Sequence, residues 1–67
     1  MGHALIVEDD ADSAQMVAAL IGNEGFSAAT ARSLRDARRQ IAMQQPDLLL
    51  LDLRLPDGNG MSLLDEH

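Results

Sequence analysis

The 67-residue sequence contains no cysteine and only one aromatic residue, Phe26. The lack of cysteine excludes a disulfide framework and a thiolate zinc site, and the lack of aromatics leaves Leu, Ile, Val, Ala and Met to build a core. No apolar run approaches the ~20 residues of a transmembrane helix, and the N-terminus lacks the basic and apolar regions of a signal peptide. We therefore expect a cytoplasmic chain that makes no membrane contact.

Basic residues are also scarce, with 5 Lys and Arg against 11 Asp and Glu and a net charge of −6. Such a charge repels phosphate backbones, so we expect no direct nucleic acid contact by this segment. The sequence is 46% hydrophobic, which is too apolar for a disordered chain. A chain of this length forms at most one small domain. The excess of acidic groups can instead serve to hold a cation.

Apolar segments at 4–8, 26–30 and 47–53 predict strands. The segment "ALIVE" contains β-branched residues and ends at acidic ones. The segment "DLLLLDL" is apolar at consecutive positions, as expected for a strand covered on both faces. The segment "FSAAT" is a weaker strand because Ala is a poor strand former.

Helices are predicted between these strands. The first covers 11–25, where Asp10 or Asp12 can cap the start and Gly25 can end the helix; its expected apolar face consists of Met16, Val17, Leu20 and Ile21.

Ser33 caps the second predicted helix, 34–45, which Pro46 ends. Its expected apolar residues are Leu34, Ala37, Ile41 and Ala42, and its basic residues are Arg32, Arg35, Arg38 and Arg39.

The segment "PDGNG" at 56–60 is expected to be a loop, and 61–67 looks like the start of a third helix. This alternation of strands and helices predicts an α/β fold with a parallel sheet and right-handed crossovers.

Acidic residues follow two of the predicted strands: Glu8, Asp9 and Asp10 at the first, and Asp52 at the last. Ligands of open α/β sheets bind beyond the carboxyl ends of the strands. If the two strands are neighbours, about 4.8 Å apart, the acids meet at one edge. Crowded carboxylates raise each other's pKa values. A divalent cation relieves that repulsion, and oxygen-only ligands suit Mg²⁺.

Asp52 stands alone at its strand end and is the natural nucleophile for forming an aspartyl phosphate. Glu8 and Asp9 are the natural metal ligands. A structural alternative is that the acids near the first helix only cap it and stabilise its dipole, while Asp52 caps a turn. Spacing favours capping for Asp10 and Asp12, and leaves both interpretations open for the other three acids.

The segments "ALIVEDD" and "LLLLDLRLPDGNGMSLL" together closely resemble the N-terminal half of receiver domains of two-component response regulators. This resemblance implies a flavodoxin-like (CheY-like) parallel sheet with helices on both faces and strand order 2-1-3-4-5. Residues 1–67 would be a partial receiver domain containing three strands, two helices and the start of a third helix.

The resemblance also implies a site. Asp52 would accept a phosphoryl group from the phosphohistidine of a sensor histidine kinase in a Mg²⁺-dependent reaction. Asp9 and Asp52 would bind the metal directly, Glu8 would act mostly through water, and the backbone carbonyl of Arg54 would complete the metal site.

The loop residues Pro56 and Gly60 would shape the start of the next helix. The resemblance implies a signalling domain that switches a downstream output, which we expect to be transcription. It would not be an enzyme beyond self-catalysed phosphotransfer and dephosphorylation.

The sequence differs from receiver domains in one respect, which is that it matches only their N-terminal half. The hydroxyl residue after the family's fourth strand and the lysine after its fifth have no counterpart in 1–67. Without a fourth strand, the strand at 47–53 becomes a bare apolar edge. We therefore expect self-association, with two such strands pairing antiparallel about a two-fold axis.

Other classes fit less well. A phosphatase of the haloacid dehalogenase type needs a second Asp two residues after its nucleophile, where this chain has Arg54. A dinucleotide-binding or P-loop domain needs a glycine-rich turn after the first strand, where this chain has the acidic "EDDADS". A receiver-like interaction module that is never phosphorylated is the remaining alternative.

Overall fold

The computed structural model describes residues 2–52 and 54–63 of the chain. A parallel sheet contains β1 (His3–Val7), β2 (Ser27–Ala31) and β3 (Leu48–Leu51) in the order β2-β1-β3. The register pairs Leu5 of β1 with Ala29 and Leu49 on its two sides. The predicted strands are confirmed, with ends that differ by one or two residues.

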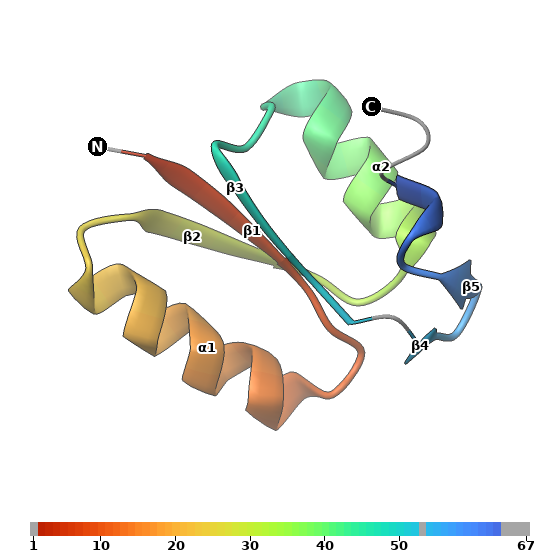
Figure 1. Ribbon diagram of the computed structural model, residues 1–67, viewed down its shortest axis with the longest axis horizontal. Helices are drawn as coiled ribbons and strands as arrows, with labels where there is room; N and C mark the ends of the chain where they lie inside the picture. Colours follow the sequence, from red (N-terminus) through yellow and green to blue (C-terminus); the bar gives the residue numbers. More distant parts are fainter. Residues whose placement is uncertain (1, 53, 64–67) are drawn as a thin grey trace.

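Helices α1 (Ala11–Asn23) and α2 (Leu34–Met43) cover opposite faces of this sheet (Figure 1). The predicted flavodoxin-like arrangement is therefore confirmed for this part of the fold. Among the described residues, neither helix has the length and apolar character needed to cross a bilayer.

Helix α1 begins at the Asp10 cap, whose carboxylate accepts hydrogen bonds from the backbone N–H and hydroxyl of Ser13. Asp12 lies in the first turn instead. The chain leaves the helix through Gly25, whose φ of 95° favours glycine. Asp10 and Gly25 thus fulfil the predicted roles at the two ends.

The predicted apolar face of α1 is partly wrong. Met16 and Leu20 are 65% and 61% exposed, whereas Val17 and Ile21 are half-buried and Ala14 is buried. The ridge that contains Ala14, Val17 and Ile21 turns toward the sheet. At about 3.6 residues per turn, Met16 lies almost opposite Ala14 on the helix, and Leu20 follows Met16 one turn later, so both face away from the sheet.

Helix α2 begins at the Ser33 cap, whose hydroxyl oxygen accepts a hydrogen bond from the N–H of Asp36. The buried residues of α2 belong to the main core, which lies on one face of the sheet. This core consists of Leu5, Val7, Ala31, Leu34, Ala37, Ile41, Leu55 and Leu63. Ala42, predicted on the apolar face, is exposed because it lies just past the strip of helix that contacts the sheet. The helix ends at Met43, before Pro46, rather than continuing to 45.

The segment 56–60 was expected to be a loop, but part of it forms a small hairpin. Strand β4 (Arg54–Leu55) pairs antiparallel with β5 (Gly58–Asn59). Leu55 is buried in the core, which holds the hairpin against the domain. Ser62 and Leu63 are helical, and the rest of the third helix predicted over 61–67 falls largely outside the described residues.

Candidate functional site

Three acidic side chains meet at the carboxyl ends of β1 and β3. Because the two strands are parallel neighbours, Glu8 and Asp9 follow one and Asp52 follows the other at the same edge. The N–H of Asp52 donates to the carbonyl of Val7 at 2.8 Å, which fixes the two strand ends together. Each residue offers a carboxylate oxygen, and these oxygens lie within 4.8 Å of one another.

Glu8 shows the electrostatic effect of this crowding. Its carboxylate accepts a hydrogen bond of 3.1 Å from the N–H of Asp10, which lowers the pKa of Glu8. Partial removal from water and the charge of Asp52 act in the opposite direction, and the pKa of Glu8 is raised overall. A cation bound among the acids would relieve this unfavourable interaction.

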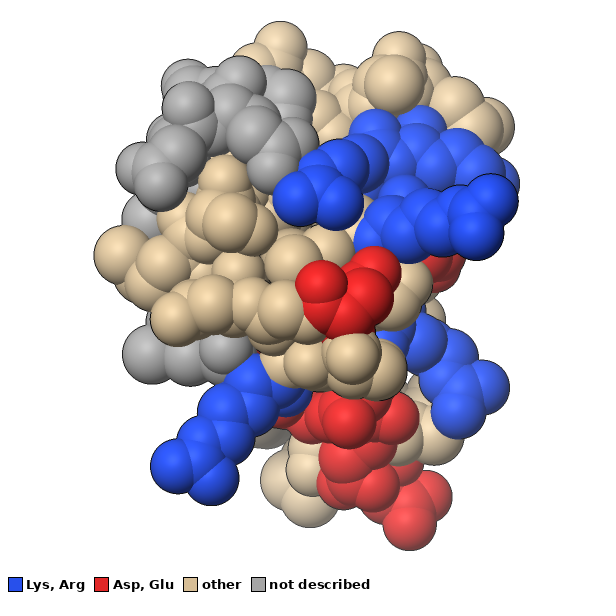
Figure 2. Space-filling model, turned by 90° about the vertical axis from the view of Figure 1, so that its right-hand side faces the viewer, with Lys and Arg blue, Asp and Glu red and all other residues tan. Residues whose placement is uncertain are grey.

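Asp52 is half-buried and is oriented by the chain that follows it. The backbone N–H of Arg54 donates to its Oδ1 at 3.0 Å. The Arg54 side chain is exposed. Figure 2, which faces the carboxyl ends of the strands, shows acidic side chains gathered on this side with arginine side chains around them.

Asp57 is a site-loop residue whose role the sequence analysis missed. Its two carboxylate oxygens accept hydrogen bonds from the N–H groups of Leu34 and Arg35, at 2.8 and 2.9 Å. These two bonds, from Leu34 first and then Arg35, lower the pKa of Asp57. Asp57 is 23 residues from Leu34 in the chain, so no local spacing pattern in the sequence predicts that it caps α2.

The two predicted loop residues lie in the turn of the hairpin and just after its second strand. Pro56 is exposed in the hairpin turn. Gly60 is buried, and its carbonyl accepts a hydrogen bond of 3.1 Å from the N–H of Leu63. The structure thus places Gly60 where the hairpin passes into the helical residues.

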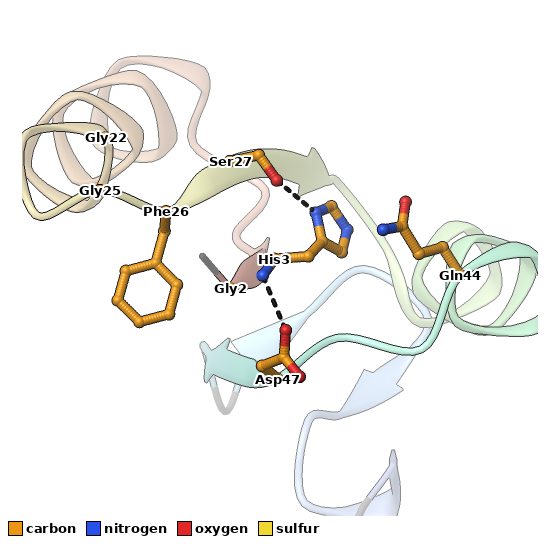
Figure 3. Close-up of a pocket in the computed structure, with 8 residues that line it drawn as sticks. All are labelled: Gly2, His3, Gly22, Gly25, Phe26, Ser27, Gln44 and Asp47. Carbon is orange, nitrogen blue, oxygen red and sulfur yellow. Dashed lines mark hydrogen bonds between the residues drawn. The ribbon is translucent and has the colours of Figure 1, made fainter.

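A cavity of about 200 Å³ adjoins the acid cluster and is lined by Glu8, Asp52, Val17 and Leu50 among others. A larger cavity of about 450 Å³ lies at the amino ends of the strands. There the His3 ring is turned toward Ser27 and the His3 N–H donates to Asp47 (Figure 3). This larger cavity is separate from the acid cluster.

The acid cluster has the donor set of a hard-cation site. Glu8, Asp9 and Asp52 supply carboxylate oxygens without nitrogen or sulfur ligands among the described residues. Mg²⁺ is commonly held by a few carboxylates while retaining several waters. The residues present therefore fit Mg²⁺, and an exposed Asp9 leaves room for its waters.

The comparisons with known proteins decide the family. The family model described as "Response regulator receiver domain" matches residues 4–66. The chain belongs to this family. The match covers both strand ends that carry the acids, and the receiver domain assignment agrees with the sheet order β2-β1-β3.

Relatives of this receiver domain are response regulators. It is 38% identical over 61 residues to the response regulator protein PilR of Pseudomonas aeruginosa, covering 91% of this chain and 14% of PilR. It is 41% identical over 68 residues to the nitrogen assimilation regulatory protein NtrX of Azorhizobium caulinodans, covering 97% of this chain and 15% of NtrX. The chain therefore spans only a small part of the length of these relatives.

A solved structure supports the fold. The non-phosphorylated HemR receiver domain of Leptospira biflexa matches with a TM-score of 0.88 and 30% sequence identity. The match covers 98% of this chain and 53% of the HemR chain. The arrangement of sheet and helices in this chain is thus the one found in the HemR receiver domain.

Proposed function

We propose that this receiver domain accepts a phosphoryl group on Asp52 from a sensor histidine kinase, in a Mg²⁺-dependent reaction that switches a downstream output. The observation that carries the proposal is the meeting of Glu8, Asp9 and Asp52 at one sheet edge, with oxygens within 4.8 Å. Membership of the receiver domain family supports the same reaction.

The reaction is a phosphoryl transfer between two side chains. An oxygen of the Asp52 carboxylate attacks the phosphorus of the kinase phosphohistidine. A bond forms between this oxygen and phosphorus, the phosphorus–nitrogen bond breaks, and the histidine nitrogen retains the electron pair. The Arg54 N–H donates to Oδ1 of Asp52 at 3.0 Å, which orients this carboxylate beside the other two acids.

Glu8, Asp9 and Asp52 are the residues that would hold Mg²⁺, with the Arg54 carbonyl as the further ligand that the resemblance implies. When bound, the metal neutralises negative charge that would otherwise keep donor and acceptor apart. Glu8 and Asp9 keep acidic oxygens beside Asp52, and the hydrogen bond from the Asp10 N–H orients Glu8.

The test is phosphotransfer to the 67-residue chain from a phosphorylated histidine kinase domain, followed by mass spectrometry of the modified peptide. We expect an acyl phosphate on Asp52 that requires Mg²⁺ and that alkali and hydroxylamine both cleave. Asp52→Asn should abolish it. Asp47→Asn is the matched control, because Asp47 precedes β3 at the opposite end of the strand and should leave transfer unchanged.

Absence of phosphate on the wild-type chain would overturn the proposal and favour the alternative, a receiver-like interaction module that is never phosphorylated. The intact acid cluster favours phosphorylation over this alternative. The family assignment disfavours a phosphatase of the haloacid dehalogenase type. Such a phosphatase also needs a second Asp at position 54, where this chain has Arg54.

The wider context forms part of the proposal. We infer that residues 1–67 act as the N-terminal half of a receiver domain, and that the hydroxyl and lysine residues of the family, which lie outside this segment, read out the phosphoryl group after its transfer to Asp52. The output is transcription control in the cytoplasm. PilR and NtrX, which are named as regulators, support this output.

We also propose self-association through β3. Among the described residues β3 pairs only with β1, and its other edge carries the half-buried run Leu48–Leu51. An unpaired apolar edge strand is a template for pairing with another chain. Sedimentation velocity of the 67-residue chain should show dimers, and a single monomeric species at all concentrations would contradict this part of the proposal.

A further inference from the structure

The hairpin that follows Asp52 is attached to the amino-terminal end of α2. Asp57, in the turn between β4 and β5, accepts hydrogen bonds from the N–H groups of Leu34 and Arg35 at 2.8 and 2.9 Å. Gly58 approaches so closely that an added Cβ would lie 2.9 Å from Cδ1 of Leu34. Figure 1 shows the β4–β5 hairpin beside this end of the helix.

The same hairpin reaches the acid cluster at its other end. Arg54 opens β4 and donates its N–H to Oδ1 of Asp52 at 3.0 Å. Arg54 pairs with Asn59 and Leu55 pairs with Gly58, so the residues on either side of Asp57 are bound to each other. A displacement of Asp57 from α2 would therefore be transmitted through a short paired segment to Arg54.

We propose that Asp57 is a positioning residue of the acid cluster: by binding the start of α2, it holds the hairpin so that the Arg54 backbone faces Asp52. Its effect on metal binding rests on the function proposed above, since Arg54 is there a backbone ligand. The effect on the Arg54 N–H does not depend on that function.

Helix α2 has a second cap, which makes the inference testable. Ser33 accepts a hydrogen bond from the N–H of Asp36 at 3.1 Å and stabilises the same first turn from within the local chain. Ser33 makes no link to the hairpin through this bond. A variant at Ser33 therefore weakens the helix start without releasing the hairpin, whereas a variant at Asp57 does both.

The experiment compares Asp57→Ala, Asp57→Asn and Ser33→Ala with the wild-type chain by amide-correlation NMR, first without metal and then in a Mg²⁺ titration. We expect Asp57→Ala to shift the Arg54 amide signal and to weaken Mg²⁺ binding about tenfold, the scale of losses at outer-shell partners of metal sites. Ser33→Ala should leave both unchanged. Asp57→Asn keeps one acceptor oxygen and should restore part of the affinity.

Equal effects of Asp57→Ala and Ser33→Ala on the Arg54 signal would overturn the inference, because a helix cap alone would then explain both. An unshifted Arg54 signal in Asp57→Ala would overturn it as well. If the signal shifts only in the Asp57 variants while the wild-type chain binds no Mg²⁺, the positioning role is supported and the proposed function fails. Asp57 is exposed, so both of its variants are expected to fold.

Discussion

The two faces of the sheet are packed very differently. On the α2 face, Leu34, Ala37 and Ile41 are buried in one core with Leu5 and Val7 of β1. On the α1 face, Ala14 is the buried helix residue, while Met16 and Leu20 remain mostly exposed. The β4–β5 hairpin, which follows Asp52, is attached to the α2 face through Leu55 and Asp57. The stability of the site therefore depends on the α2 face far more than on the α1 face.

The largest expected effect comes from truncating a core leucine on the α2 face. Leu34 is 2% exposed, and Leu34→Ala should lower the free energy of unfolding by about 2–5 kcal/mol. This is a large part of the stability of so small a domain. Leu20→Ala on α1 is the matched control and should change it by less than about 0.5 kcal/mol. Urea unfolding followed by circular dichroism measures both, and similar losses would refute the contrast.

Replacing two glycines by alanine should change the stability of the chain in opposite directions. Gly58 has φ +145° and no room beside Leu34, so Gly58→Ala should destabilise the chain by more than about 1 kcal/mol. Gly22 lies in α1 with no heavy atom within 4 Å of an added Cβ, and Gly22→Ala should stabilise it by about 0.5–1 kcal/mol. Thermal unfolding of the two variants checks the signs. A stabilising Gly58→Ala would show that the hairpin does not approach α2 as described.

A smaller effect concerns acid pH. The pKa of Asp57 is lowered in the folded chain, so its stabilisation is present above the unfolded pKa and is lost as pH falls through the folded one. Below about pH 4 the wild-type chain should therefore lose stability more steeply than Asp57→Asn. Asp10, which caps α1, also has a lowered pKa, so Asp10→Asn should flatten the same limb. Urea unfolding at a series of pH values measures the slopes, and wild-type and variant profiles that run parallel would argue against both caps.

Much of the fold follows from local sequence patterns. The strand 48–51 is an unbroken apolar run, and the Asp10 and Ser33 caps lie immediately before their helices. These signals depend on neighbours in the chain, which explains why the order of elements and the starts of both helices were predictable. Met16 and Leu20 were mispredicted because α1 has apolar residues on more than one side, and the sequence does not say which side faces the sheet.

The candidate site likewise has one part that the sequence predicts and one part that it does not. The grouping of Glu8, Asp9 and Asp52 was expected from strand ends alone, given two parallel neighbours. The β4–β5 hairpin and the contact of Asp57 with Leu34 and Arg35 were not. Those features depend on a turn meeting a helix that begins more than twenty residues earlier, and no spacing rule in a single sequence encodes such a meeting.

The most direct test of the central claim is a Mg²⁺ titration of the wild-type chain followed by amide-correlation NMR. The claim is that Glu8, Asp9 and Asp52 form a metal site in this chain. We expect dispersed signals with saturable shifts confined to these three residues and Arg54, all absent in Asp52→Asn. A folded spectrum with no Mg²⁺ response, or with shifts centred on Asp47 at the opposite end of β3, would contradict the claim.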